Sequence, residues 1–318
     1  MNLPRVAAIS LAVIASVAPA GGQSGNCLER IIPLSIVSKD GSPLPNIGPS
    51  TFTGSTQGGA VKINSVILDL QPRRVLLLLD VSGSFDRMSD WHTDTALDLL
   101  DHIPPPNEVG VAIFSESIKL LAPPTTDRAQ IREQIDSMFG HTSTRSTVKF
   151  KGRTSLWDSI RDGAKLLGSQ RFGDVVFVIS DGKDSKSKAN AVEATSSLLA
   201  QGVRLFAVQV TDPRLDPERM VGFDPDNILA KSAYQTGGLA VVPERWNSSP
   251  PENGKIPVWL RRDLDLQYRQ ILYFYRIDLT LGQAVKKQKG LKLSLADSDK
   301  SARTNFELNY PKFISPCN

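Results

Sequence analysis

Apolar runs and apolar helical stripes alternate along the middle of the chain. Positions 75–79 are apolar throughout, which is typical of a strand buried on both faces of a parallel sheet. Six strands are predicted, at 74–80, 109–114, 117–121, 174–180, 203–210 and 238–242. Apolar residues three and four positions apart predict helices between them, with the stripes Ala96, Leu99, Leu100, Ile103; Ile131, Ile135, Met138, Phe139; and Leu156, Ile160, Ala164, Leu167.

This alternation predicts an α/β domain over residues 71–243. Its sheet is expected to be doubly wound, six-stranded and mostly parallel. The short connection at 114–117 predicts one antiparallel edge strand. Ser155, followed three positions later by Asp158, predicts a capping box at the start of the third helix.

Short β-strand patterns lie on both sides of the α/β region. Residues 27–70 form the N-terminal β flank, and residues 244–257 form a linker rich in Pro, Asn and Ser. Residues 258–318 carry a helical pattern followed by a C-terminal β flank. Neither flank is long enough to bury a core of its own. We therefore expect the two flanks to pair, with the α/β domain inserted between them.

Oxygen-bearing side chains follow the first buried strand directly. Asp80, Ser82 and Ser84 stand at alternate positions, so in an extended segment their side chains point the same way. Gly83 allows the backbone to turn between them. Carboxylate and hydroxyl oxygens suit a hard divalent cation such as Mg²⁺. Taken alone, this pattern is also an ordinary turn after a strand.

Two later segments favour the metal interpretation. Thr154 stands just before a predicted helix, and Asp181-Gly182 follows the second long apolar run. Strand ends of one sheet lie side by side, so Asp80 and Asp181 can face one site.

These residues together resemble a von Willebrand factor type A (VWA) domain and its metal-ion-dependent adhesion site. The resemblance implies a Rossmann-like strand order of 3-2-1-4-5-6, with the ligand crevice at the point where the order reverses. It also implies Mg²⁺ or Mn²⁺ held by Ser82, Ser84 and Thr154, with Asp80 and Asp181 mostly holding metal-bound waters. The flanks resemble those of a group of secreted bacterial proteins built around this domain.

The N-terminus predicts export. Residues 1–20 read as a signal peptide, with an apolar stretch at 6–17 and the cleavage pattern Ala18-Pro19-Ala20; a retained membrane anchor is the alternative. A secreted or periplasmic location is expected. The chain has 318 residues, 40% hydrophobic and 22% charged, as in globular proteins. The net charge of +4 is too small to indicate nucleic acid.

Catalytic patterns are weak in this sequence. Ser82 does not lie in G-x-S-x-G, and the three histidines His92, His102 and His141 share no metal-ligand spacing. There is no phosphate-binding G-x-x-x-x-G-K-[ST] loop. We therefore expect a binding protein, not an enzyme. The alternatives are an envelope assembly factor that needs no metal, and a metal-dependent hydrolase. A hydrolase that pairs Ser82 with His92 is disfavoured, because Ser82 is better used as a metal ligand.

Basic residues gather in the two loops that would border the metal. We call Arg145, Lys149, Lys151, Arg153 and Lys183 the basic rim. Lys186 and Lys188 follow, against the single acidic Asp184. Such a rim favours a protein partner that presents an Asp or Glu carboxylate. The alternative is a pair of solvated loops with no partner.

The only two cysteines, Cys27 and Cys317, predict a disulfide in an oxidising compartment. A bond between them would close nearly the whole chain into one loop and, in the chain-entropy model, contribute about 4–5 kcal/mol. Peptide mapping without reductant should recover the two cysteines in one linked peptide. Recovery of both as free thiols would contradict the bond.

Overall fold

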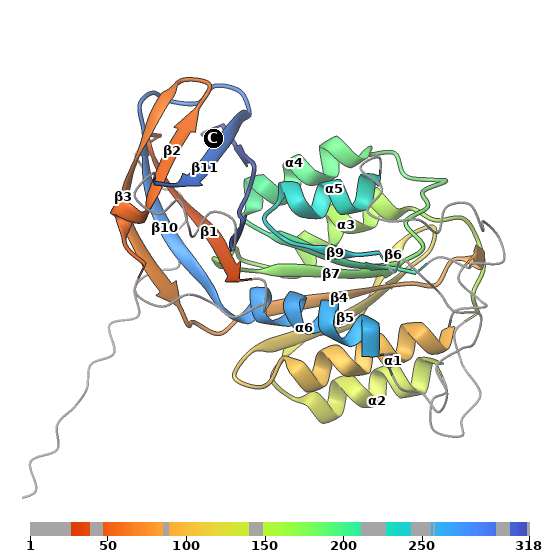
Figure 1. Ribbon diagram of the computed structural model, residues 1–318. Helices are drawn as coiled ribbons and strands as arrows, with labels where there is room; N and C mark the ends of the chain where they lie inside the picture. Colours follow the sequence, from red (N-terminus) through yellow and green to blue (C-terminus); the bar gives the residue numbers. More distant parts are fainter. Residues whose placement is uncertain are drawn as a thin grey trace, which may run out of the picture.

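The computed structural model describes residues 27–38, 47–84, 89–139, 149–210, 227–242, 256, 258–296 and 306–316. The signal peptide at 1–20, Arg145, Cys317 and all but one residue of the 244–257 linker lie outside these ranges. The described chain forms two β-sheets, one with helices on both faces and one without (Figure 1).

The six-stranded sheet confirms the predicted fold class and strand order. Its order is β6-β5-β4-β7-β8-β9, and only β6 runs antiparallel to its neighbour. The strand bounds differ from prediction by a few residues at most. They are β4 Arg74–Asp80, β5 Glu108–Phe114, β6 Ile118–Thr125, β7 Val175–Ser180, β8 Arg204–Gln209 and β9 Ala240–Val241.

Helices cover both faces of this sheet, so all seven residues of β4 are buried. Val75, Leu77 and Leu79 face one core, which also contains residues of three helices: α1 Ser89–His102, α2 Arg128–Phe139 and α6 Val258–Leu272. Leu76 and Leu78 face the opposite core. It contains residues of α3 Leu156–Leu166, α4 Ala191–Gln201 and α5 Ile228–Gln235. The predicted apolar stripes are the buried sides of α1, α2 and α3.

The helix α6 was grouped with the C-terminal flank in the sequence analysis. Its buried residues instead pack in the α/β core, next to α1. They are Leu260, Leu264, Tyr268 and Ile271. The OH of Tyr268 donates to Asp98 of α1 at 2.9 Å, and Arg261 also pairs with Asp98. The residues that follow the VWA region in sequence therefore complete its core.

Both flanks contribute strands to one antiparallel sheet. The order is β12-β1-β10-β3-β2-β11-β13, so the C-terminal strand β10 lies between the N-terminal strands β1 and β3, and β11 pairs with β2. The strands are β1 Glu29–Ser38, β2 Phe52–Thr56, β3 Gly59–Asp69, β10 Phe274–Leu281, β11 Lys289–Leu295, β12 Phe306–Asn309 and β13 Phe313–Ile314, with a 3-10 turn at Pro49–Thr51.

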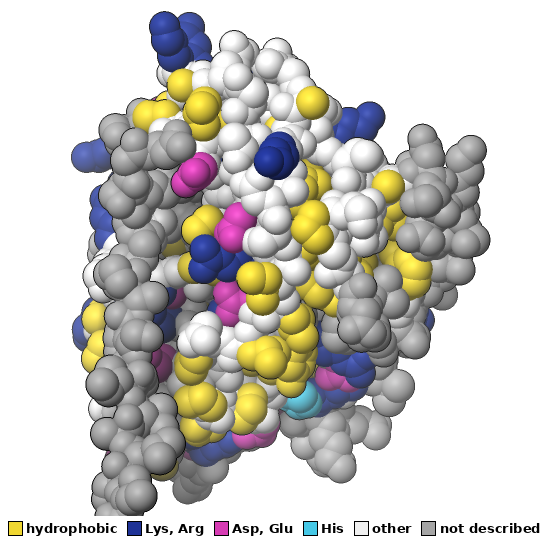
Figure 2. Space-filling view, turned by 90° about the vertical axis from the view of Figure 1, so that its left-hand side faces the viewer, with side chains coloured by type: hydrophobic (Ala, Val, Ile, Leu, Met, Phe, Trp, Pro, Cys, Tyr) yellow, Lys and Arg dark blue, Asp and Glu magenta, His cyan; other side chains and the backbone are white. Residues whose placement is uncertain are grey.

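One face of the flank sheet encloses a core of its own, and the other is exposed. On the exposed face the register places Ile31 beside Asp278 and Ile67 beside Arg276. Figure 2 shows the flank side of the molecule, where apolar side chains gather around charged ones. Ile67 is 57% exposed there.

Two arginines join the flank sheet to the α/β core. The guanidinium carbons of Arg73 and Arg204 lie 4.1 and 4.2 Å from the centre of the Phe274 ring, at the start of β10. Arg204 also donates to the carbonyls of Gln270 and Ile271, which satisfies the last turn of α6. Burial lowers the pKa of Arg204 well below its usual value. This joint lies at the amino-terminal ends of β4 and β8, away from the strand ends that carry Asp80 and Asp181.

The predicted disulfide can be followed in the structure only as far as Cys27. Cys27 lies just before β1, and no free cysteine occurs in the described ranges. Because Cys317 lies outside them, the Cys27–Cys317 bond stays a prediction. Of the helices that the structure describes, none has the length and apolar character needed to cross a membrane.

Candidate metal site

Asp80 is the last residue of the central strand β4, and its side chain is fully buried. The backbone N–H of Ser82 donates to Asp80 Oδ1 at 2.9 Å, which turns the chain tightly after the strand. The hydroxyl oxygens of Ser82 and Ser84 lie 3.2 Å apart, with Ser82 buried and Ser84 exposed. The three alternate side chains therefore gather at the strand end as the sequence predicts.

Backbone hydrogen bonds hold the segment that leads to Thr154 against the end of β4. Lys151 N–H donates to Val81 O, and Gly83 N–H donates to Gly152 O, each at 3.2 Å. The segment that precedes Thr154 is thereby fixed to the segment that carries Ser82 and Ser84. Gly152 has a φ of +82°, a conformation that glycine adopts without the steric cost of a side chain. Thr154 itself is buried.

Asp181 follows β7, the parallel neighbour of β4. Lys183 N–H donates to Asp181 Oδ1 at 3.0 Å. Asp181 Oδ2 is buried and has no hydrogen-bond partner among the described residues. The exposed Lys183 ammonium lies 3.5 Å from it, a distance and exposure that give a weak ion pair.

The environment of Asp80 disfavours its charged form. Burial, with a smaller contribution from the nearby charge of Asp181, raises the pKa of Asp80 to about 6, although hydrogen bonds from Ser180 and Ser82 oppose the rise. The Ser180 hydroxyl donates to Asp80 Oδ2 at 2.6 Å. Two buried carboxylates thus lie close enough to repel each other, and a cation between them would relieve that repulsion.

The donor set fits a hard divalent cation. It consists of two carboxylates and three hydroxyls, which are oxygen ligands of the kind that Mg²⁺ and Mn²⁺ accept. Asp181 Oδ2 accepts no hydrogen bond from the described residues and has only the weak ion pair with Lys183, so it leaves an acceptor available. The described residues contain no group of three or more His, Cys, Asp or Glu side chains that would suit a different metal centre.

The basic rim is described only in part. Lys149, Lys151, Arg153 and Lys183 are exposed at this end of the sheet, and Arg145 lies outside the described ranges. The side chain of His92 in α1 is likewise not described, so its pairing with Ser82 is untested.

Glu116, in the turn between β5 and β6, was missed by the sequence analysis. Its carboxylate pairs with Lys186 and accepts from Arg153 N–H at 3.3 Å, which lowers the pKa of Glu116. The rim is therefore less basic than its two loops suggest. Glu116 could have been found from its position just after β5, because β5 lies next to β4 in the sheet.

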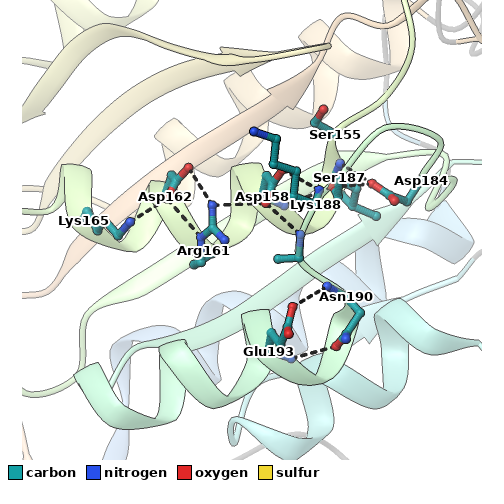
Figure 3. Close-up of polar contacts among 12 residues, drawn as sticks. Ser155, Asp158, Arg161, Asp162, Lys165, Asp184, Ser187, Lys188, Asn190 and Glu193 are labelled. Carbon is teal, nitrogen blue, oxygen red and sulfur yellow. Dashed lines mark hydrogen bonds and ion pairs between the residues drawn. The ribbon is translucent and has the colours of Figure 1, made fainter.

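The predicted capping box at α3 is wrong. The Ser155 hydroxyl donates to Glu116 O at 3.1 Å and caps nothing in its own helix. The first turn of α3 is capped by another loop instead. Leu156 N–H donates to Asp184 Oδ1 at 2.8 Å, and Asp158 N–H donates to Ser187 Oγ at 3.1 Å (Figure 3).

Sequence comparison identifies the family. A family profile described as "VWA domain containing CoxE-like protein" matches residues 52–229. The chain belongs to this VWA family. The match runs from β2 to the start of α5, so it includes all five predicted metal-site residues. A search of curated proteins found no match.

Solved structures resemble this chain at low identity, each with a TM-score below 0.5. BatB from Bacteroides thetaiotaomicron is 16% identical, with 62% of this chain and 98% of that chain covered and a TM-score of 0.45. A von Willebrand factor type A protein from Catenulispora acidiphila is 11% identical over 91% of this chain and 74% of that chain, with a TM-score of 0.44. Proximal thread matrix protein 1 of the mussel byssus, described with a zinc-occupied MIDAS motif, is 14% identical over 66% and 49%, with a TM-score of 0.43. These likenesses are too distant to carry an argument about function.

Ser180 was also missed by the sequence analysis, and its role is testable. Ser180→Ala removes the hydroxyl that donates to the buried Asp80 carboxylate. We expect a loss of about 1–3 kcal/mol in the free energy of unfolding, measured by urea titration with chelator present. The control is Ser35→Ala, which removes a buried hydroxyl that has no partner in the described chain. Equal stability of the two variants would contradict the role of Ser180.

Proposed function

We propose that this protein is an exported recognition module that binds a protein partner through a divalent metal at the Asp80–Asp181 site. The observation that carries the proposal is the set of oxygen-bearing side chains at the ends of two neighbouring strands: Asp80, Ser82 and Ser84 after β4, and Asp181 after β7. Asp181 Oδ2 is buried without a hydrogen-bond partner among the described residues, and backbone hydrogen bonds hold the segment before Thr154 against the end of β4. Membership of the VWA family supports the same interpretation.

Each residue has a distinct part in this proposal. Ser82, Ser84 and Thr154 would hold the cation, and Asp80 and Asp181 would act through water molecules bound to it. A Mg²⁺ or Mn²⁺ ion held largely by neutral hydroxyls keeps the electrophilic character to accept one further oxygen. A carboxylate of the partner completes the coordination shell.

The basic rim supports a partner with an acidic surface. Lys149, Lys151 and Arg153 are exposed and precede Thr154 directly. Positive charge around the metal attracts an acidic surface over a distance of about 10 Å at moderate salt and speeds encounter. Glu116 pairs with Lys186 and lies close to Arg153, and the exposed lysines at 149 and 151 remain available for this attraction.

Binding without turnover is the expected outcome. The Ser82 hydroxyl lies 3.2 Å from the Ser84 hydroxyl, which suits a pair of metal ligands better than a nucleophile paired with a histidine. A metal-independent assembly factor of the envelope remains the alternative, because the flank sheet presents a broad surface of its own. Metal-dependent capture of a partner separates the two functions. The signal peptide and the Cys27–Cys317 bond belong to the same proposal of an exported protein.

The metal claim is tested with Asp80→Ala. This variant should lose Mn²⁺ binding in calorimetry while its far-ultraviolet circular dichroism stays that of the folded protein, because Asp80 ends a strand and fills no core. Asp162→Ala is the control, since Asp162 is also an aspartate but pairs with Lys165 and Arg161 on α3. Unchanged Mn²⁺ affinity in Asp80→Ala would refute the assignment.

The partner claim is tested with a double charge reversal, Lys149→Glu with Lys151→Glu. Binding of a partner captured in Mg²⁺ and released by chelator should become weaker and less sensitive to salt, mainly through a slower association rate. Lys165→Glu, on α3 and outside the rim, should have little effect. If charge reversal changes neither the affinity nor the salt dependence, the rim does not recognise the partner.

A further inference from the structure

The loop after Asp181 holds Thr154 by its backbone. Thr154 N–H donates to Ser185 Oγ at 3.0 Å, and Thr154 O accepts from the N–H groups of Ser185 and Lys186 at 2.9 and 3.0 Å. Both polar backbone groups of a proposed metal ligand are therefore bound by one neighbouring segment. We call residues 184–188 the clamp loop.

The clamp loop also caps the helix that begins after Thr154. Asp184 Oδ1 accepts from Leu156 N–H at 2.8 Å and from the Ser187 hydroxyl at 2.5 Å. Ser187 Oγ in turn accepts from Asp158 N–H at 3.1 Å. In most helices these first-turn donors are satisfied by the residue just before the helix. In α3 they are satisfied from a loop about thirty residues away in sequence.

The capping is reciprocal. The Asp158 carboxylate of α3 accepts from the N–H groups of Lys188 and Ala189 at 2.8 and 3.1 Å, and Arg161 lies 3.1 Å from it (Figure 3). Each segment thus satisfies backbone donors of the other. This is the hydrogen-bond exchange of a capping box, but it is divided between two distant segments.

We propose that Asp184, Ser185 and Ser187 are positioning residues of the metal site, which fix Thr154 relative to Asp181. The proposal rests on the proposed function, because it concerns the same metal. The clamp loop is hydrogen-bonded to Thr154 and begins three residues after Asp181. These hydrogen bonds therefore join the two segments that carry Thr154 and Asp181. Groups that orient metal ligands without touching the metal typically change its affinity by about 10- to 100-fold when they are removed.

The neighbouring helix α4 provides a matched control. Its cap is local: Asn190 Oδ1 accepts from Glu193 N–H, and Glu193 Oε2 accepts from Asn190 N–H, each at 3.0 Å. Figure 3 shows this cap beside the clamp. Asn190→Ala removes the same kind of helix cap as Asp184→Ala, but it touches no proposed metal-site residue.

The experiment measures Mn²⁺ affinity by calorimetry and the midpoint of urea unfolding in metal-free buffer for each variant. Asp184→Ala should weaken Mn²⁺ binding by about tenfold or more. Asp184→Asn should stay within about twofold of the parent protein, because an amide oxygen can accept the same two hydrogen bonds. Asn190→Ala should lower the unfolding midpoint as Asp184→Ala does and leave Mn²⁺ affinity unchanged.

Three results would overturn the proposal. Unchanged Mn²⁺ affinity in Asp184→Ala would show that the clamp does not position the site. A loss in Asp184→Asn equal to that in Asp184→Ala would show that the charge of Asp184 matters, and not its hydrogen bonds. An equal loss in Asn190→Ala would show a general effect of reduced stability. Asp80→Ala is measured alongside to test the metal site itself. Normal Mn²⁺ binding in Asp80→Ala would show that the proposed metal site is wrong. Lost Mn²⁺ binding in Asp80→Ala with unchanged binding in Asp184→Ala would show that only the clamp proposal is wrong.

Discussion

The candidate metal site depends on a carboxylate at the end of β4, a strand whose residues are all buried. Every residue of β4 is enclosed between two layers of helices, so Asp80 enters an environment that disfavours charge. The backbone of Ser82 and the hydroxyl of Ser180 compensate in part. The neighbouring Asp181 adds repulsion. The arrangement is costly for a protein that only needs to fold, and it becomes reasonable when a cation shares the two carboxylates.

The rest of the chain holds this strand end in a fixed environment. The helix α6 completes one layer over β4, although it follows the α/β region in sequence. The flank sheet joins the core at the opposite end of the strands, where Arg73 and Arg204 stack on Phe274. The candidate metal site and the attachment of the flank therefore lie at opposite ends of one sheet. This separation leaves the metal end of the sheet free of the flank strands.

Much of the fold could be predicted from the sequence because it depends on local periodicity. The run at 75–79 and the helical stripes predicted the layers. The positions of Asp80 and Asp181 directly after two apolar runs predicted that they end neighbouring strands. The errors involve contacts between distant segments. Ser155 looked like a helix cap, but Asp184 and Ser187 supply the cap across a gap that no local pattern reveals. Glu116, which lies far from the basic loops in sequence, likewise pairs with Lys186 and lowers the positive charge there.

We propose that one divalent cation lies among Ser82, Ser84 and Thr154. Anomalous diffraction from crystals grown with Mn²⁺ tests this directly, because the ion is located by its own scattering. We expect one strong peak beside these three hydroxyls, with Asp80 and Asp181 in its outer shell. A saturating Mn²⁺ concentration that gives no peak there, or a peak only at other carboxylates such as those of Asp158 and Asp162, would contradict it.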